Sequence, residues 1–589
     1  MGKILSTDRS EEVMRILLIC FILLSSVPVW SATFEPQWGR QGMVSTTVGP
    51  AAAAGQSILE AGGNAVDAGI ATAFAAAVAH PFSSGLGGGL FAVLHDVKTN
   101  TSRSLDARET APASASIAWY EENPQSIRSG PRSVGVPGMV QGLWTLHQEY
   151  GSLPWAQLIE PAIGLAENGV KVSIWHHNIV ERVAEQLAQF PETQRVQTVD
   201  GKAPPLGWNH VQPDLAETLR YVQKKGGQAL AVGPIAKKIE VATGGVITEL
   251  DLARFQAKWR EPIRAPYRGY EFVGMPLPSS GGVLLAQMFK ILERYDLAAM
   301  GKDSSEFIHL VASVMKVAFE DRAQYLGDTD FYDVPVERLI SDEYADQQAA
   351  RLNPQGQPSP GVEINQVPDD AGTTHISVMD SHGNAVAITQ TVNTLFGSKI
   401  TVPGTGIVLN NEMDDFSIGP ELPNAWEAVG TAANAVAPGK RPLSSMTPTV
   451  VLKDGVPVMV VGSSMGTTII SSILHTLINV IDFGFDAQRA VNAPRFHHQW
   501  KPDSLTIEPE FPQDVRKNLE NLGWSIRERP FFGASELIIY DRENCLFWGG
   551  ADGRRDSRAL GANIGAIPRP SEQVSCVADI PNSTSVVPE

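Results

Sequence analysis

The chain has 589 residues, of which 43% are hydrophobic and 19% charged, and its formal net charge is −18. This composition is typical of a globular protein long enough to bury a sizeable core. The acidic excess argues against nucleic acid and against an anionic membrane surface as partners, because both would repel it. The three cysteines form no cluster with the spacing of metal ligands, so we expect neither a metal nor another cofactor.

An apolar run near the N-terminus has the pattern of a secretory signal. Residues 16–27 are mostly apolar, follow Arg15 and are closed by a segment that includes Ser31 and Ala32. A basic start, an apolar middle and small residues at the end are typical of a signal peptide, and the run is too short to cross a bilayer. We therefore expect residues 1–31 to be removed and the mature protein to be exported, periplasmic or secreted, without a membrane anchor.

Two cysteines, Cys545 and Cys576, remain after removal of this signal. In an exported chain they either form a disulfide or stay as separate thiols, and the sequence leaves both possibilities open. Cys576 lies in a segment rich in proline and serine, and residues 566–589 are predicted to form a disordered tail.

The first half of the chain is predicted to be largely helical. Residues 51–79 are rich in alanine and glycine, which predicts closely packed helices. A glycine-rich loop over 83–89 then leads into a predicted strand over 91–96; it lacks the third glycine of a dinucleotide-binding fingerprint and follows no strand. Residues 304–324 carry apolar residues at helical spacing and predict an amphipathic helix.

Strands are predicted to dominate the second half. The expected elements there are strands over 373–380, 385–392, 405–410, 447–453 and 457–462 and a helix near 467–482. The first two strands are separated by a turn that contains Gly383 and Asn384, so they are predicted to form a β-hairpin.

Thr373 stands at the start of this hairpin, directly after Gly372. Taken alone, a threonine here is best interpreted as an ordinary strand residue. It can also become the N-terminal residue of a self-cleaved chain, and its own α-amine would then activate its hydroxyl as a nucleophile. Gly372 would suit a strained cleavage site, because glycine tolerates unusual φ and ψ.

Polar residues gather on the predicted loops that follow, at Asn393, in the segment 410–416 and in the segment 441–445. Such residues commonly lie in turns and at hairpin ends. The same set also suits an amino-acid headgroup, because carboxylates bind its ammonium whereas an arginine and hydroxyls bind its carboxylate. Arg108, further upstream, is either that arginine or a member of a surface ion pair.

A second candidate nucleophile is Ser464, in the G-x-S-x-G pattern of residues 462–466, which lies between a predicted strand and a predicted helix. That context is the one a serine-hydrolase nucleophile requires. The acid and the histidine that would follow in chain order are Asp482 or Asp486, then His497 or His498. Against this esterase hypothesis, no regular βαβ alternation precedes the pattern. The same loop can instead offer backbone N–H groups as an oxyanion hole for another nucleophile.

A series of motifs in fixed order resembles one family, the γ-glutamyltransferases of the N-terminal-nucleophile hydrolases. The motifs occupy residues 62–68, 83–89, 135–138, 278–282, 373–375, 410–416, 440–446 and 494–500. The resemblance implies an α/β (α+β) fold, a four-layer αββα sandwich, made as a precursor that cuts itself between Gly372 and Thr373. Residues 32–372 would form the large subunit and residues 373–589 the small one, intertwined in one globule.

The resemblance also implies roles for individual residues. Thr373 would be the nucleophile and its α-amine the base, while Thr391 would orient the hydroxyl. Three groups of residues match the positions that bind the substrate: Arg108, Ser444 and Ser445 for the α-carboxylate, Asn393, Glu412 and Asp415 for the α-amino group, and the backbone of Met465 and Gly466 as oxyanion hole. Glutathione and other γ-glutamyl amides are the implied donors, with water or an amino acid or peptide as acceptor.

Two positions depart from the family pattern. Met465 stands where the family commonly has glycine, and Trp426, in the lid segment 420–438, stands where a tyrosine is frequent. The first change bears on donor choice and the second on the balance of hydrolysis against transfer. A glutaryl-type amide acylase on the same fold is the neighbouring alternative, and an exported binding protein that never cleaves is a third interpretation.

Overall fold

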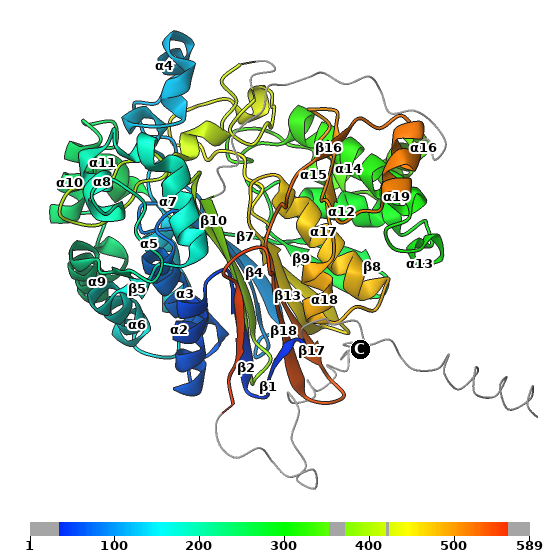
Figure 1. The fold of residues 1–589 in the computed structure, drawn as a ribbon, viewed down its shortest axis with the longest axis horizontal. Helices are drawn as coiled ribbons and strands as arrows, with labels where there is room; N and C mark the ends of the chain where they lie inside the picture. The colour runs from blue at the N-terminus through cyan, green and yellow to red at the C-terminus, as the bar shows by residue number, and fades with distance from the viewer. Residues whose placement is uncertain (1–34, 353–371, 420–422, 564–589) are drawn as a thin grey trace, which may run out of the picture. The chain divides into compact units, whose positions relative to one another are not determined.

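Two seven-stranded β-sheets lie face to face, and helices cover the outer face of each (Figure 1). The computed structural model describes residues 35–352, 372–419 and 423–563, so the predicted signal peptide and C-terminal tail lie outside it. Neighbouring strands are antiparallel throughout both sheets. This order of layers is the αββα sandwich that the resemblance implied, and the predicted fold is confirmed.

The strands form two large and two small sheets. Sheet A consists, in spatial order, of β1 (Gln37–Gly39), β18 (Leu546–Ala551), β17 (Ser535–Asp541), β13 (Val456–Ser463), β12 (Thr449–Lys453), β9 (Tyr270–Gly274) and β8 (Ile263–Tyr267). Sheet B consists of β19 (Arg558–Gly561), β2 (Gly42–Thr46), β10 (Gly372–Asp380), β11 (Ala385–Asn393), β3 (Gly89–Asp96), β4 (Thr101–Ala107) and β7 (Lys258–Arg260). The small sheets are β14 (Phe496–His497), β15 (Leu505–Ile507) and β16 (Ile526–Glu528), and β5 (Val170–Lys171) with β6 (Asn209–His210).

Each large sheet shares a hydrophobic core with its own helices. Those packed with sheet B include α2 (Gly49–Glu60), α3 (Ala65–Ala79), α5 (Met139–Tyr150), α6 (Trp155–Asn168), α9 (Pro213–Lys225), α10 (Pro234–Ala242) and α11 (Glu249–Arg254). Those packed with sheet A include α12 (Gly281–Leu292), α13 (Leu297–Met300), α14 (Ser305–Tyr325), α15 (Val336–Leu339), α16 (Asp342–Arg351), α17 (Thr468–Ile481), α18 (Ala487–Asn492) and α19 (Gln513–Asn521).

The remaining described helices are short or peripheral. They are α4 (Ala118–Glu122), α7 (Ile174–Leu187), α8 (Pro191–Gln197) and the 3-10 turns η1 (Pro124–Ile127), η2 (Pro131–Ser133), η3 (Gly226–Gln228), η4 (Glu412–Asp415) and η5 (Ala432–Asn434). Among the described residues, no helix combines the length and the hydropathy that a bilayer span needs.

The motif at residues 62–68 starts a helix. Asn64 is the N-cap of α3 and accepts a hydrogen bond from the backbone N–H of Asp67, whose carboxylate accepts the N–H of Asn64 in return. This capping box satisfies two of the donors that a helix start leaves open. Every residue of α3 is buried, because its small side chains let it pack closely against α2 and sheet B.

The hairpin β10–β11 occupies the middle of sheet B, and its side chains alternate between the two faces. Ile376 and Val378 of β10 belong to the core on the helix side. On the other face His375 and Ser377 point toward sheet A, where Ser377 Oγ donates to the backbone oxygen of Glu536 in β17 at 3.0 Å. Thr373 has the same parity as His375 and Ser377, so it also lies on the face between the sheets.

One predicted strand is wrong. Residues 405–410 form no strand but make isolated bridges, Thr401 to Val408 and Gly87 to Leu409. Gly404 and Gly406 have φ values of +63° and +68°, which interrupt an extended backbone. The other predicted strands of the second half are confirmed, with ends that differ by one or two residues.

The contact between the sheets provides a stability test. A Cβ atom on Gly462 of β13 would lie 2.2 Å from Cε1 and 2.3 Å from Nδ1 of His375, and that imidazole is held by Thr389 and Ser377 at 2.8 and 3.0 Å. We expect Gly462→Ala to lower the free energy of unfolding by about 1–3 kcal/mol through overpacking, measured by urea denaturation.

The matched control is Gly164→Ala in helix α6, where the nearest atom to the new Cβ is 4.0 Å away. Alanine is the better helix former by about 1 kcal/mol, so this variant should be as stable as the parent or more stable. Equal stabilities of Gly462→Ala and the parent would show that the sheets adjust freely at this contact.

Candidate active site

Thr373 lies at the start of β10 and pairs across the hairpin with Thr391 of β11. Their hydroxyl oxygens are 3.1 Å apart. Thr391 Oγ1 donates a hydrogen bond to the carbonyl oxygen of Gly372 at 2.6 Å and accepts the backbone N–H of Asn393 at 2.8 Å. Because a hydroxyl has one proton, Thr373 is the donor between the two threonines. One side chain therefore contacts both the Thr373 hydroxyl and the carbonyl of the preceding peptide bond.

Glycine is required at position 372 for a steric reason. A Cβ there would lie 2.4 Å from the backbone oxygen of Thr394 and 2.8 Å from that of Asn393. The close approach of the end of β11 therefore selects glycine. That glycine also tolerates a strained backbone at this cleavage site stays a prediction.

A cavity with about 310 Å³ of empty space opens beside Thr373, and we call it the Thr373 cavity. It collects most of the residues that the sequence indicated. Those lining it are Arg108, Thr373, Thr391, Asn393, Glu412, Asp415, Trp426, Ser444, Ser445 and Gly466. The sequence analysis missed others that line it, namely Arg322, Asn424, Met446, Thr467 and Ile469.

Arg108 is held by acids rather than left open. Its side chain is 1% exposed and forms ion pairs with Glu412 and Asp415, while its Nε donates to the backbone oxygen of Pro442 at 3.3 Å. Glu109 lies 3.8 Å from the same guanidinium. The residues expected at the two ends of an amino-acid headgroup thus contact each other directly.

Three carboxyl groups therefore share one guanidinium, and burial raises the pKa of all three. Glu109 is the clearest case, because both of its oxygens are buried without a hydrogen-bond partner. Burial raises its pKa to about 8, against the opposing effect of Arg108. A raised pKa favours the protonated form of Glu109, which reduces the negative charge around Arg108.

Ser445 contacts a different arginine. Arg322 of α14 donates from Nη2 to Ser445 Oγ at 3.3 Å and from Nε to Ser280 Oγ at 3.0 Å. Arg322 was detectable in principle, because it continues the apolar stripe of the predicted helix at 304–324, four residues after Ala318. A charged residue on the buried stripe of a helix is unusual and indicates a partner or a function.

The turn between β13 and α17 has two left-handed residues in succession. Met465 has a φ of +88° and Gly466 one of +56°, and neither N–H donates to a group of the described residues. Consecutive N–H groups in such a turn form an anion-binding concavity. Gly466 lines the Thr373 cavity, whereas the Met465 side chain packs on Phe532 and accepts the N–H of Gly533 at Sδ, 3.2 Å away.

Trp426 ties the segment that follows residue 422 to the wall of the cavity. Its indole Nε1 donates to Asn393 Oδ1 at 2.8 Å, and its ring lies so close to Gly466 that a Cβ there would be 2.2 Å from it. The preceding lid residues bind the acids of η4, since Asn424 donates to Asp415 at 3.2 Å and the Ala425 N–H donates to Asp414 at 2.8 Å.

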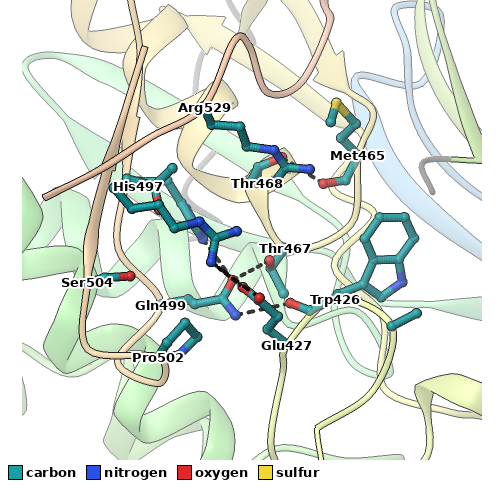
Figure 2. A pocket seen from close by; sticks show the side chains of 13 residues that line it. Trp426, Glu427, Met465, Thr467, Thr468, His497, Gln499, Pro502, Ser504 and Arg529 are labelled. Carbon is teal, nitrogen blue, oxygen red and sulfur yellow. Dashed lines mark hydrogen bonds and ion pairs between the residues drawn. The ribbon is translucent and has the colours of Figure 1, made fainter. Parts of the chain in front are cut away.

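A second hollow, with about 550 Å³ of empty space, is lined by Ala425, Trp426 and Glu427 of the same segment. We call it the Arg527 cavity, and it shares Trp426 and Thr467 with the Thr373 cavity. Figure 2 shows Gln499 between Thr467 and the backbone of Trp426, to which it donates at 3.0 Å. Polar and charged residues thus line both the Thr373 cavity and the Arg527 cavity.

The esterase hypothesis is wrong, because the Ser464 triad is not assembled. Ser464 Oγ is buried without a hydrogen-bond partner. His497 Nδ1 instead bonds to Ser471 at 2.9 Å, and His498 Nε2 bonds to Asp503 at 3.0 Å. The acids also have other partners, since Asp482 accepts from Tyr267 and Asp486 caps α18.

Comparison with known proteins agrees with this geometry. The profile of the gamma-glutamyltranspeptidase family matches residues 51–562. The chain belongs to this family. A glutathione hydrolase proenzyme from Escherichia coli (strain K12) is 39% identical over 539 residues, which cover 88% of this chain and 92% of that relative. Acylase ACY 1 proenzyme from Pseudomonas sp. (strain SE83) is 36% identical over 530 residues, or 87% of this chain and 92% of that one.

Two solved structures are similar to this chain in fold. A cephalosporin acylase from Bacillus halodurans superposes with a TM-score of 0.81 at 29% identity and covers 91% of this chain and 98% of its own. A gamma-glutamyltranspeptidase chain from Helicobacter pylori gives a TM-score of 0.51 at 36% identity, covering 55% of this chain and 96% of its own.

Because burial raises the pKa of Glu109, the free energy of unfolding should depend on pH. Between about pH 5 and pH 8 the folded protein keeps this carboxyl protonated while the unfolded chain ionises it. The unfolded state then binds fewer protons, so the stability contributed by this group falls as the pH rises through that range. We expect Glu109→Gln, which needs no proton, to lose less stability between these pH values, measured by urea denaturation.

Glu510→Gln at an exposed position is the control and should keep the pH profile of the parent. If the free energy of unfolding falls with pH equally in Glu109→Gln and in the parent, Glu109 is already ionised in the folded protein.

Proposed function

We propose that this protein is a self-processing γ-glutamyltransferase and glutathione hydrolase that uses Thr373 as its nucleophile. The observation that carries the proposal is the Thr391 hydroxyl, which lies 3.1 Å from Thr373 Oγ1 and donates to the Gly372 carbonyl at 2.6 Å. The Thr391 hydroxyl thus contacts both the proposed nucleophile and the carbonyl group that it would attack. The name proenzyme, given to the Escherichia coli relative, supports a precursor that is cut.

In the self-cleavage step, Thr373 Oγ1 attacks the carbonyl carbon of Gly372. A carbon–oxygen bond forms, the peptide carbon–nitrogen bond breaks, and the hydroxyl proton ends on the Thr373 nitrogen. Thr391 donates to the carbonyl oxygen where negative charge develops, which stabilises the transition state. The α-amine of Thr373 is free once the carbon–nitrogen bond has broken, and water then hydrolyses the ester, which frees the Thr373 hydroxyl and leaves Gly372 with a C-terminal carboxylate. The products are the predicted subunits 32–372 and 373–589.

In turnover the freed amine takes the proton of Thr373 Oγ1, which attacks the γ-carbonyl of the donor. The backbone N–H groups of Met465 and Gly466 are unused by the described residues and would bind the oxyanion. The amine product leaves with a proton, and a γ-glutamyl ester on Thr373 remains. Water gives hydrolysis, and the amine of an amino acid or peptide gives transfer.

The acids of the cavity favour a γ-glutamyl donor over a glutaryl one. A γ-glutamyl group carries an ammonium and a carboxylate, whereas a glutaryl group has no ammonium. Glu412 and Asp415 both line the cavity and suit an ammonium, with Asn393 beside them. A glutaryl group carries a carboxylate but no ammonium. It would bring a negative charge close to Glu412 and Asp415 without a positive charge that could pair with them.

The Arg527 cavity gives room for the amine that leaves or attacks. It begins beyond the Trp426–Thr467 wall and is lined by Arg527, Gln499 and Thr506 among others. Arg527 pairs with Glu427 at 3.1 Å. Polar groups of both charges suit the peptide part of glutathione or a peptide acceptor. Export of the mature protein follows from the predicted signal and completes the proposal.

Removal of the Thr373 hydroxyl tests both chemical steps. We expect Thr373→Ala to remain a single chain on a denaturing gel and to lose at least 99% of the activity on γ-glutamyl p-nitroanilide, since removing a catalytic nucleophile costs on the order of 10⁴-fold or more. Thr373→Ser should still cut itself.

The matched control is Thr374→Ala, which removes the neighbouring buried hydroxyl that has no partner. This variant should be cut and active. A Thr373→Ala protein that still splits at this bond, or still turns over, would contradict the assignment of the nucleophile.

The indole N–H of Trp426 provides a second test. Trp426→Phe keeps a ring over Gly466 but removes the hydrogen bond to Asn393 Oδ1. Loss of such a bond is worth about 1 kcal/mol, so kcat/KM for γ-glutamyl p-nitroanilide should fall about fivefold. Trp259→Phe, at the edge of sheet B and outside both cavities, loses an indole bond to Glu149 and should retain the parental kcat/KM. Identical kcat/KM values for Trp426→Phe and the parent would exclude a role for this bond.

A further inference from the structure

Side chains, rather than a strand, bind the first carbonyl groups of β10 along one of its edges. On that edge the ladder between β10 and β2 ends at the pair Ile376 and Thr46. Thr46 Oγ1 donates to the carbonyl oxygen of His375 at 2.7 Å, and Arg555 Nη1 donates to that of Thr373 at 3.1 Å. The carbonyl groups of alternate strand residues point to the same edge. Arg555 therefore continues the row of hydrogen bonds that β2 begins.

Arg555 is a buried cation that is held in place. It lies in the segment between β18 and β19 and is 7% exposed. Its guanidinium carbon is 5.4 Å from the centre of the ring of Trp175 in α7, and a cation is attracted to the face of such a ring. Because little water reaches the guanidinium, its charge acts on neighbouring groups with less screening than a surface charge.

The nitrogen of Thr373 faces this charge. In a strand the N–H and the C=O of one residue point to the same edge, so the nitrogen lies on the edge where Arg555 binds the carbonyl. Backbone geometry limits the distance between these two atoms of one residue, which places Nη1 within about 7 Å of the nitrogen. Self-cleavage would turn this amide into an α-amine, whose ordinary pKa of about 8 leaves it mostly protonated at neutral pH. A protonated amine cannot act as the base.

Other ionisable groups also surround the start of β10. Between the sheets, burial lowers the pKa of His375 to about 3 and raises that of Glu536 well above its usual range, which favours the neutral forms of both. Lys399, beyond the end of β11, donates to the backbone oxygen of Leu395. The wall of the Thr373 cavity contributes charges of both signs, from Arg108, Arg322, Glu412 and Asp415.

Arg555 also lines a further cavity, together with His80, His176 and Asp556. Asp556 accepts a hydrogen bond from Ser173 and lies 3.8 Å from His80. Burial lowers the pKa of His80, and the charge of Arg555 adds to this effect against that of Asp556. Burial likewise lowers the pKa of His176 to about 3. The charge of Arg555 thus already disfavours protonation of one basic group in its neighbourhood.

We propose that Arg555 is a positioning residue for the base of this reaction. It holds the start of β10 by the Thr373 carbonyl and places a positive charge beside the α-amine that self-cleavage frees, so that this amine is neutral and accepts the hydroxyl proton at neutral pH. A nearby cation disfavours the charged form of an amine. The inference rests on the proposed function and adds to it a residue from the C-terminal end of the described chain.

The alternative is that Arg555 only ties the start of β10 to Trp175 of α7. The two roles differ in how the loss of Arg555 depends on pH. A purely structural role lowers kcat/KM equally at every pH. A role through charge lowers kcat/KM only at low pH, because at high pH the amine is neutral with or without the arginine.

The experiment measures kcat/KM of the cleaved enzyme for γ-glutamyl p-nitroanilide from about pH 5 to about pH 10. Arg555→Gln keeps a side-chain N–H donor but removes the charge. We expect the acidic limb of its profile to move to higher pH by about one unit, which lowers kcat/KM about tenfold below both limbs and leaves the plateau within about twofold of the parent's.

Two further variants separate the charge from the position. Arg555→Lys keeps a positive charge, and its acidic limb should lie closer to the parental one than that of Arg555→Gln. The matched control is Arg558→Gln, which removes an arginine three residues further on, at an exposed position of β19. This variant should keep the parental limb.

A measurement on the parent keeps the test decisive if Arg555→Gln does not fold or is not cut. Cyanate reacts with neutral amines, so its reaction with the Thr373 amine can be followed against pH by mass spectrometry of the fragment that begins at Thr373. A synthetic peptide of residues 373–378 is the reference. The midpoint of the reaction in the protein should lie about one pH unit below that of the peptide.

Equal midpoints in the protein and the peptide would overturn the inference. So would an Arg555→Gln profile whose acidic limb coincides with the parent's, including one in which kcat/KM is lowered equally at every pH. If the active parent contains no fragment that begins at Thr373, the proposed function itself is overturned, whereas a cut and active parent with an unshifted midpoint overturns only the role of Arg555.

Discussion

The pairing of Thr373 with Thr391 across the β10–β11 hairpin is the constraint on which the site depends. The register of two central strands places one hydroxyl beside another and beside the Gly372 carbonyl. Strand register cannot slip by one residue without turning every side chain to the opposite face. The buried alternation of Ile376 and Val378 on the helix side therefore fixes where the Thr373 hydroxyl points. The chemistry is positioned by the same burial that stabilises the sheet.

Charge is the second organising feature of the site. Glu109, Glu412 and Asp415 surround Arg108, and Arg322 lines the same cavity as Arg108; all of these side chains are largely buried. Such a cluster is expensive to desolvate and contributes little to stability by itself. Under the proposed function its value lies in recognition, because the ammonium of a γ-glutamyl donor would pair with these acids.

The fold and part of the candidate site could be predicted from the sequence. The other features could not, because they depend on contacts between residues that are far apart in the chain. Two β-rich runs around a turn predicted the hairpin, whereas the sandwich and the role of Thr391 came from the resemblance carried by the ordered motifs. The ion pairs of Arg108 were not predictable, since Glu412 follows it by some three hundred residues in the chain and only the packed fold brings them together. Arg322 was missed because an amphipathic helix explained its neighbours, although its charge on the buried stripe was a signal. The strand over 405–410 failed because Gly404 and Gly406 adopt left-handed turns.

The contact between Gly466 and Trp426 has a consequence for how members of this family can diverge. A single added carbon at residue 466 would collide with the indole, so the bulk of the lid ring is tolerated only because the turn beneath it lacks a side chain. The two positions form one steric unit, and a larger residue in the turn requires a smaller or displaced ring above it. Sequence change at either place should therefore occur as a compensated pair, which links the evolution of the cover to that of the turn.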